Sequence, residues 1–409
     1  MLKGNAIVGQ SGGPTAAINA TLSGVIRGAL SLKGECINTL YGMRNGIEGF
    51  LREDFVDLFS VFDSEDKLRT LENTPAAALG SCRKKMKKYE ADPETYAQIL
   101  AIFKKYDIRY FFYIGGNDSM DTVLQLSRYA ASNDYEMRVV GVPKTVDNDL
   151  AATDHTPGFG SAAKFVATTM KELLRDVNVY TMKAVTIVEV MGRDAGWLTA
   201  SSALAKVSGG EGPDLIYLPE RAFDYDRFLA DVNEALSRHP AVLVAVSEGI
   251  RLADGTYVCE GTSLGATDAF GHKALSGTGR VLEAFIKEKI GCKVRSIELN
   301  LPQRCAAHIA SLTDITESVG VGKSAVHFAA EGKTGVMATI DRKNSEKYEV
   351  SFGSADIANI ANAVKHVPEE YINAEGNGIT EAGMKYLAPL IIGETAPEFE
   401  NGLPKHIKI

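Results

Sequence analysis

The 409-residue sequence is 45% hydrophobic and 23% charged, with a formal net charge of −8 at pH 7, which is ordinary for a globular protein of two or three domains. This charge argues against a broad surface for nucleic acid or anionic membranes, so an anionic substrate would need locally clustered lysine and arginine. Without a long apolar run, a secretory signal or a Cys-x-x-Cys pair, the sequence favours a cytoplasmic protein with reduced thiols and no membrane span.

The first predicted element is a short buried strand at residues 6–8, followed by a turn that contains Gly12, Gly13 and Pro14. The apolar-periodic run at residues 16–30 predicts a helix with Pro near its first turn. The free N–H groups of such a helix start, next to glycines that admit a phosphate, make an anion site. The spacing differs from Gly-x-Gly-x-x-Gly, so a dinucleotide fold gains no support, and a plain structural turn is the alternative.

A basic run follows at residues 83–88, directly after Gly80-Ser81-Cys82. Such runs are usually solvated helix faces, and we expect that for most of this one. Its first residue, Arg83, is the one we expect to face a phosphate.

An aromatic strand at residues 110–114 ends in Gly115-Gly116-Asn117-Asp118-Ser119 and leads into a helix at 120–129. This is a second glycine turn between a strand and a helix. Strands and helices that alternate at this spacing predict a largely parallel, doubly wound sheet.

The strand at residues 138–142 leads into Pro143-Lys144-Thr145-Val146-Asp147-Asn148-Asp149-Leu150. Open α/β sheets place their ligands at the carboxyl ends of strands. On extended backbone, Asp147 and Asp149 would point the same way. One acid could take a proton from a hydroxyl while the other helps to hold Mg²⁺. A polar turn with solvated acids is the alternative.

The second half offers arginine and glutamate at strand ends. A strand at residues 184–190 ends in Met191-Gly192-Arg193, and one at 241–246 ends in Ser247-Glu248-Gly249, with Arg295 and Arg304 further on. This division predicts a phosphoryl donor on the N-terminal lobe and a phosphorylated acceptor on residues 151–304.

Two other patterns carry no chemistry. Gly320-Val321-Gly322-Lys323-Ser324 lacks the first glycine of a phosphate-binding P-loop, because Glu317 stands in its place. The seven histidines show no metal-ligand spacing, so we expect them to be structural or exposed.

Six motifs occur in one order: Ser-Gly-Gly, Gly-Gly-x-x-Ser, Pro-x-Thr-x-Asp-Asn-Asp, Met-Gly-Arg, Ser-Glu-Gly and Gln-Arg. Together they resemble the phosphofructokinase family over residues 4–370. The resemblance implies two doubly wound, Rossmann-like α/β lobes with a cleft between them. The expected division is a donor lobe at 1–150 to which 305–355 returns, a sugar-phosphate lobe at 151–304 and a C-terminal extension at 356–409.

The resemblance also implies phosphorylation of the 1-hydroxyl of fructose 6-phosphate, with Asp147 as the general base. Thr145 lies beside the phosphoryl group in this reading, and Asn117 and Asp149 beside Mg²⁺. The sugar phosphate is expected to contact Thr145, Asp147, Met191, Gly192, Arg193, Glu248, Arg295 and Arg304. The donor is expected to contact Gly12, Gly13, Arg83, Gly116 and Ser119.

Arg295 is similar to the arginine that the family lends across a subunit interface, which implies a homodimer or homotetramer. Three departures stand out: Asn117 where the family more often has Asp, Leu301-Pro302 before Gln303-Arg304, and Ala184 in place of a second cross-subunit arginine.

Two positions indicate the donor. ATP-using relatives carry glycine where this chain has Asp118, and a carboxylate there would repel a nucleotide's α-phosphate by about 4 kcal/mol at about 4 Å. The second position is Lys144, whose ammonium could bridge Asp118 and a transferring phosphate. This pairing resembles the pyrophosphate-dependent branch and implies reversible phosphorylation in glycolysis or gluconeogenesis. The alternatives are an ATP-dependent or other sugar-phosphate kinase of the same fold, and a non-catalytic sugar-phosphate-binding subunit.

Overall fold

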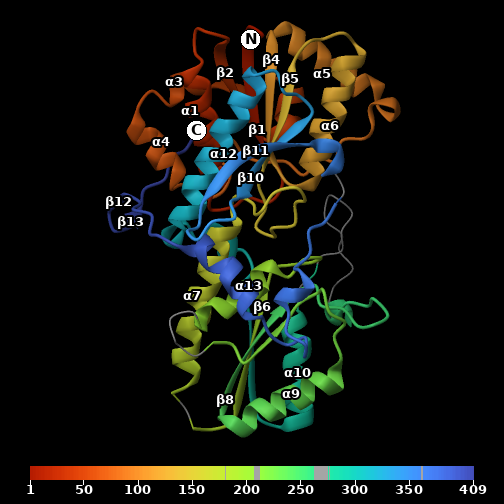
Figure 1. Cartoon of the computed structure of the whole chain (residues 1–409), viewed down its shortest axis with the longest axis vertical. Helices are drawn as coiled ribbons and strands as arrows, with labels where there is room; N and C mark the ends of the chain where they lie inside the picture. Colours follow the sequence, from red (N-terminus) through yellow and green to blue (C-terminus); the bar gives the residue numbers. More distant parts are fainter. Residues whose placement is uncertain (180, 207–211, 262–274, 276, 361–362) are drawn as a thin grey trace.

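The computed structural model describes residues 1–179, 181–206, 212–261, 275, 277–360 and 363–409. Within them the chain forms two lobes stacked along its long axis, each built on a largely parallel sheet flanked by helices (Figure 1). The predicted α/β class is confirmed. None of the described helices is both long and apolar enough to cross a bilayer.

The first lobe contains a seven-stranded sheet in the order β11-β10-β5-β4-β1-β2-β3. The five inner strands run parallel, and the edge strands β11 and β3 pair antiparallel with their neighbours. The strands are Gly4–Gln10 (β1), Ile37–Met43 (β2), Phe55–Asp57 (β3), Ile108–Gly115 (β4), Arg138–Pro143 (β5), Val336–Arg342 (β10) and Val350–Asp356 (β11). The last two strands follow the second lobe in sequence, so the chain returns to this sheet.

Both faces of this sheet are buried, because successive side chains of a strand point to opposite faces. On β4, Phe112 and Ile114 pack with the helices of one face, and Phe111 and Tyr113 pack with those of the other. The lobe's helices are Ile18–Ser31 (α1), Gly46–Leu51 (α2), Leu58–Val61 (α3), Glu65–Glu72 (α4), Pro93–Lys105 (α5), Asn117–Ser132 (α6) and Leu312–Ala330 (α12).

Helices α1 and α12 cross closely through glycines. A Cβ atom on Gly24 would lie 2.1 Å from the Val319 carbonyl oxygen, and one on Gly322 would lie 2.2 Å from that of Thr21. Residues 320–324 therefore belong to a packed helix, and the prediction that they form no P-loop is confirmed.

The second lobe has a four-stranded parallel sheet in the order β7-β8-β6-β9. Its strands are Ala184–Val190 (β6), Leu215–Tyr217 (β7), Ala241–Ser247 (β8) and Lys293–Glu298 (β9). Its helices are Phe159–Val177 (α7), Trp197–Ser201 (α8), Tyr225–Arg238 (α9), Thr278–Ile290 (α10) and Pro302–Cys305 (α11).

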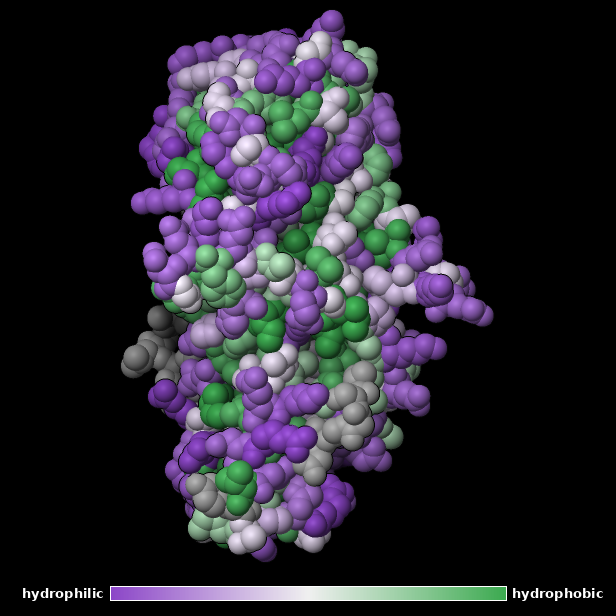
Figure 2. Space-filling model, turned by 90° about the vertical axis from the view of Figure 1, so that its left-hand side faces the viewer, coloured by the Kyte–Doolittle hydropathy of each residue, from purple (hydrophilic) through white to green (hydrophobic). Residues whose placement is uncertain are grey.

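The C-terminal extension packs on the body, as predicted. Leu387 and Leu390 join the apolar cluster of α7 and α8, and the backbone N–H of Ile407 donates to Thr74 Oγ1 of the first lobe at 3.0 Å. The extension contains Glu381–Leu387 (α13) and a hairpin of Phe399–Glu400 (β12) and Leu403–Pro404 (β13). The face in Figure 2 is largely hydrophilic towards its two ends, with apolar residues interspersed between them.

Two local predictions are wrong. Helix α1 begins at Ile18, so Pro14 lies outside it and the glycine turn is longer than expected. The basic run at residues 83–88 is irregular backbone and not a helix, so its cations are placed individually by tertiary contacts. Cys36, Cys82, Cys292 and Cys305 carry free thiols, as expected.

Candidate active site

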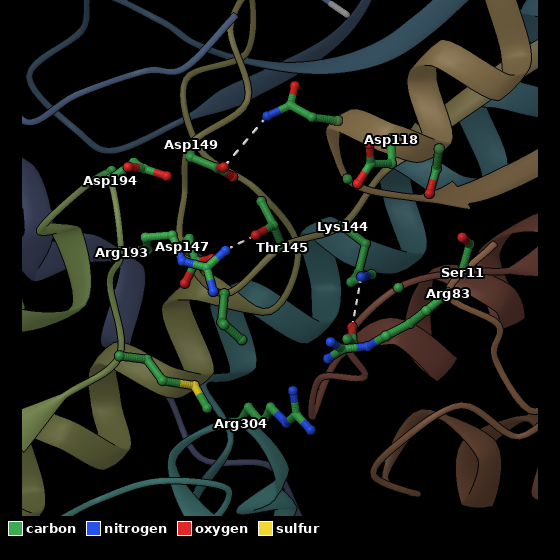
Figure 3. Close-up of a pocket in the computed structure, with 18 of the residues that line it drawn as sticks. Ser11, Arg83, Asp118, Lys144, Thr145, Asp147, Asp149, Arg193, Asp194 and Arg304 are labelled. Atoms are coloured by element: carbon green, nitrogen blue, oxygen red, sulfur yellow. Dashed lines mark hydrogen bonds between the residues drawn. The ribbon is translucent and has the colours of Figure 1, made fainter. Parts of the chain in front are cut away.

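A cavity of about 540 Å³ lies where residues that follow β1, β4 and β5 meet residues that follow β6 and β8 (Figure 3). It gathers most of the residues that the sequence singled out. Those that line it are Gly12, Gly13, Arg83, Gly116, Asn117, Asp118, Ser119, Lys144, Thr145, Asp147, Asp149, Met191, Arg193, Glu248 and Arg304. Their individual roles remain predictions.

Two predicted site residues do not line this cavity. Gly192 shapes the turn after β6: its φ is +146°, and a Cβ atom there would lie 2.6 Å from the Ala195 carbonyl oxygen. Arg295 is exposed on the edge strand β9 and lines a separate small pocket with Met182 and Ala184. At this position Arg295 could contact only a ligand that binds outside this cavity.

The first glycine turn brings backbone close to two cations. Gly12 has φ +77°, a conformation that favours glycine, and a Cβ atom there would lie 3.3 Å from Lys144 Nζ. A Cβ atom on Gly13 would lie 3.2 Å from Arg304 Nη1. Glycine at both positions therefore leaves space beside positive charge, which suits a phosphate group.

The loop that carries the two acids is braced by its own hydrogen bonds. The Asp147 backbone N–H donates to Thr145 Oγ1 at 3.1 Å, and Thr156 Oγ1 donates to the Thr145 carbonyl at 2.8 Å. Asn148 has φ +53°, so the predicted extended backbone from Asp147 to Asp149 is wrong. Both acids nevertheless line the cavity, because the left-handed residue turns the chain between them.

Burial and mutual repulsion favour the protonated forms of the acids. Burial, followed by the charge of Asp149, raises the pKa of Asp147 to about 7. Burial also raises the pKa of Asp149. Across the cavity, burial and the charge of Asp147 raise the pKa of Glu248 to about 8. A carboxylate with a pKa near neutrality is suited to accept a proton from a substrate.

Lys144 is buried, and its Nζ donates to the Gly13 carbonyl oxygen at 2.6 Å. Burial lowers its pKa to about 8, against the opposing influence of Asp147 and Asp149. An anion that entered the cavity would restore the preference for the charged ammonium.

Asp118 pairs with a cation that the sequence did not indicate. In the structure Lys85 Nζ, and not that of Lys144, lies 3.2 Å from Asp118 Oδ1. The bridge that Lys144 could form between Asp118 and a transferring phosphate stays a prediction. The Asp118 side chain is 31% exposed and points to the cavity from the start of α6 (Figure 3).

The donor set of Asn117 and Asp149 fits a divalent cation. Asn117 Oδ1 is buried and has no hydrogen-bond partner among the described residues, while Asn117 Nδ2 lies 3.4 Å from Asp149 Oδ2. Amide and carboxylate oxygens are the ligands that Mg²⁺ accepts. No group of three or more His, Cys, Asp or Glu side chains in the described part of the chain could hold a metal by itself.

Eight lining residues were not among the predicted site residues: Ser11, Pro14, Lys84, Lys85, Val146, Asp194, Ala195 and Val364. Asp194 belongs to the turn after Met-Gly-Arg and forms an ion pair with Arg251. Lys85 belongs to the basic run at residues 83–88, which was its only signal in the sequence, and no sequence signal pointed to Val364.

The chain resembles known proteins over its whole length. Residues 5–329 match the family described as phosphofructokinase. The pyrophosphate–fructose 6-phosphate 1-phosphotransferases of Halomonas elongata and Methylococcus capsulatus are each 42% identical, covering 100% and 99% of this chain and 97% and 96% of theirs. A crystal structure of the pyrophosphate-dependent phosphofructokinase from Nitrosospira multiformis superimposes with a TM-score of 0.89 at 39% identity, covering 99% of this chain and 96% of that one. The chain therefore belongs to the phosphofructokinase family.

Proposed function

We propose that this chain is a phosphotransferase that moves a phosphoryl group from pyrophosphate to the 1-hydroxyl of fructose 6-phosphate. The products are fructose 1,6-bisphosphate and phosphate. The observation that carries the proposal is the shared cavity, in which Asp118 and Lys144 lie with the paired acids Asp147 and Asp149. The relatives from Halomonas elongata and Methylococcus capsulatus, each 42% identical over nearly the whole chain, carry the name of the same activity.

Asp147 is the general base in this mechanism. Its pKa of about 7 allows it to accept the proton of the sugar 1-hydroxyl as the oxygen attacks phosphorus. Thr145 fixes the backbone of Asp147 through its hydroxyl oxygen, so the carboxylate is held in one orientation. Phosphoryl transfer requires little covalent chemistry of a protein beyond such positioning and the neutralisation of charge.

The cations divide between donor and acceptor. Lys144, beside the Gly12-Gly13 turn, and Arg83 stabilise the negative oxygens of pyrophosphate. Arg193 and Arg304, together with Met191 and Glu248, bind the sugar phosphate. Planar guanidinium groups suit the bidentate recognition of phosphate.

Mg²⁺ would be held by Asn117 and Asp149, and when bound it would neutralise charge on the donor. The asparagine contributes an oxygen without a formal charge. The aspartate expected from the family would contribute an oxygen and a negative charge.

Donor choice depends on Asp118. Its carboxylate adds negative charge where a nucleotide would place its α-phosphate, and pyrophosphate has no such group. Lys85 offsets part of that charge at the rim. Because the bonds broken and formed are of similar energy, the reaction is readily reversible and could serve glycolysis or gluconeogenesis.

We also propose a cytoplasmic homodimer or homotetramer. The exposed position of Arg295 on the edge strand β9 suits a residue donated to a neighbouring subunit. The proposed division is the donor lobe at 1–150 with 305–355, the sugar-phosphate lobe at 151–304 and the extension at 356–409.

A steady-state panel tests the activity. Pyrophosphate and ATP are compared as donors with fructose 6-phosphate and other sugar phosphates as acceptors, each with Mg²⁺. The proposal expects formation of fructose 1,6-bisphosphate with pyrophosphate as the better donor. A greater kcat/KM with ATP, or with another sugar phosphate, would contradict it.

A further inference from the structure

A short piece of the C-terminal extension lies against the loop that carries the two acids. The Lys365 backbone N–H donates to the Asp149 carbonyl oxygen at 2.8 Å, and Val364 pairs with Leu150 in an antiparallel bridge. Val364 lines the cavity. The extension thus reaches the active-site loop from more than 200 positions away in sequence.

The Lys365 side chain is half-buried and ties this loop to its own far end. Nζ donates to Asn148 Oδ1 at 3.2 Å and to the carbonyl oxygens of Thr153 at 3.3 Å and Asp154 at 2.7 Å. Asn148 is the left-handed residue between the two acids. An ammonium has three protons, so these three acceptors satisfy it.

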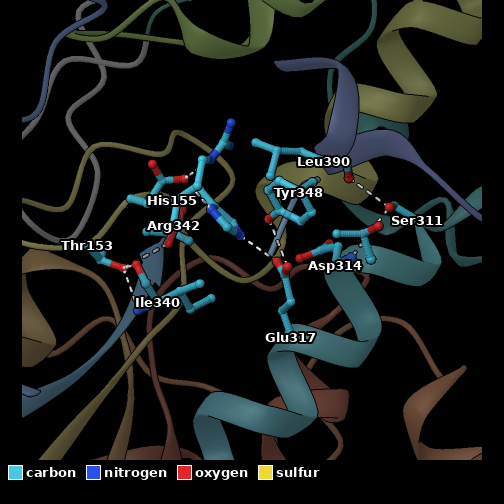
Figure 4. Close-up of polar contacts among 12 residues, drawn as sticks. Thr153, His155, Ser311, Asp314, Glu317, Ile340, Arg342, Tyr348 and Leu390 are labelled. Atoms are coloured by element: carbon cyan, nitrogen blue, oxygen red, sulfur yellow. Dashed lines mark hydrogen bonds and ion pairs between the residues drawn. The ribbon is translucent and has the colours of Figure 1, made fainter. Parts of the chain in front are cut away.

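The far end of the loop is itself anchored. Thr153 Oγ1 accepts from the Ile340 N–H of β10 at 3.0 Å, and the His155 ring bonds Asp154 at 2.8 Å and Glu317 of α12 at 2.6 Å (Figure 4). Lys365 therefore connects Asn148, at the turn between the two acids, to a point fixed by the first lobe's sheet and helix.

The same segment also binds the second lobe. Trp197 Nε1 donates to the Lys365 carbonyl oxygen at 2.9 Å, and the Val367 N–H donates to Glu220 Oε1 at 2.9 Å. His366 Nδ1 lies 2.9 Å from the Asp194 carbonyl oxygen, one residue after Arg193. Residues 365–367 therefore contact both the loop of the proposed base and the turn of a proposed sugar-phosphate ligand.

We propose that Lys365 is a positioning residue for phosphoryl transfer, which fixes the turn of Asp147 and Asp149 relative to the second lobe. The proposal rests on the proposed function. Lys365 does not line the cavity, so it acts through Asn148 and the loop backbone. A displacement of about 1 Å in a reacting group can lower a rate by about a hundredfold, so a loosened turn should affect kcat strongly.

The test compares the full-length wild type with Lys365→Met, which keeps an unbranched side chain and removes all three donors. Lys343→Met is the matched control, because Lys343 is exposed and pairs only at the surface with Glu349. The measurements are Tm, and kcat and KM for fructose 6-phosphate with pyrophosphate and Mg²⁺. Active sites are counted by calorimetric titration with fructose 6-phosphate.

We expect Lys365→Met to lower kcat by about 30- to 100-fold per active site, with KM changed by less than about threefold. The control should match the wild type. If the role of Lys365 were purely structural, the substitution would lower Tm without lowering kcat selectively over KM. A folded Lys365→Met enzyme with kcat within about twofold of the wild type overturns the proposal.

Trp197→Phe keeps an aromatic ring and removes the indole N–H that holds the Lys365 carbonyl. It should lower kcat by about fivefold, the equivalent of one hydrogen bond. If Lys365→Met fails to fold, an unchanged kcat in Trp197→Phe overturns the proposal instead. A wild type without pyrophosphate-dependent turnover would contradict the proposed function and is a separate outcome.

Discussion

Replacing Asp118 with glycine should redirect the donor preference towards ATP. The carboxylate lies at the start of α6 and points into the cavity (Figure 3). Two unit charges about 4 Å apart repel by about 4 kcal/mol at an effective dielectric constant near 20. Because Asp118 is 31% exposed and Lys85 lies 3.2 Å away, we halve this to about 2 kcal/mol, or roughly 30-fold in kcat/KM.

The assay measures kcat/KM for pyrophosphate and for ATP in the wild type, Asp118→Gly and Asp118→Asn. The asparagine variant removes the charge and keeps the size, so the two substitutions separate repulsion from steric exclusion. We expect the ATP-to-pyrophosphate ratio to rise about 30-fold in Asp118→Asn, which removes the repulsion, and by more in Asp118→Gly, which also opens space. The exposed ion pair with Lys85 stabilises the fold by at most about 1 kcal/mol, so both variants should remain folded. A ratio within about twofold of the wild type in both variants would refute this reasoning.

Three further outcomes follow from the site and its surroundings. Asp147→Ala should lower turnover by about 10²- to 10⁴-fold while calorimetry still detects fructose 6-phosphate binding; turnover near that of the wild type would remove Asp147 as the base. In the free enzyme, kcat/KM should fall below about pH 7, where Asp147 is protonated, and again above about pH 8, where Lys144 loses its charge; a flat pH profile would contradict both assignments. Burial lowers the pKa of His155, but Asp154 and Glu317 outweigh it and raise the pKa above 6.5, so their ion pairs are fully present below pH 6.5 and are lost as the pH rises through the raised value. At pH 6, Glu317→Gln should therefore destabilise the protein by about 3 kcal/mol in urea unfolding, and a change below about 1 kcal/mol would show that the buried pair adds nothing.

The pH profile has a direct internal check. Mg²⁺ bound at Asn117 and Asp149 would favour the ionised form of Asp147, so saturation with the metal should move the acid limb to lower pH. An acid limb that is independent of Mg²⁺ concentration would place the metal elsewhere.

The parallel sheets were predictable because strands buried on both faces read as unbroken apolar runs that end in glycine and polar residues. The predicted strand at residues 184–190 coincides with β6, and that at 138–142 lies within β5. Open sheets bind ligands at the carboxyl ends of their parallel strands. Most of the site residues that were predicted from these strand ends therefore line one cavity.

The features that the sequence could not reveal are a backbone conformation and contacts between residues that lie far apart in sequence. The spacing of Asp147 and Asp149 does not indicate that Asn148 between them has a left-handed backbone conformation. The partner of Asp118 comes from an irregular segment, so no periodicity could assign it to Lys85. Lys365 meets Asn148 only through the tertiary fold, 217 positions away.

The most direct test of the donor assignment is a competition. Wild-type protein receives fructose 6-phosphate, Mg²⁺ and equal concentrations of pyrophosphate and ATP, and the time course is followed by ³¹P NMR. We expect the pyrophosphate signal to be consumed first, with phosphate and fructose 1,6-bisphosphate appearing in equal amounts. Earlier loss of the γ-phosphate signal of ATP, with ADP appearing, would contradict the account.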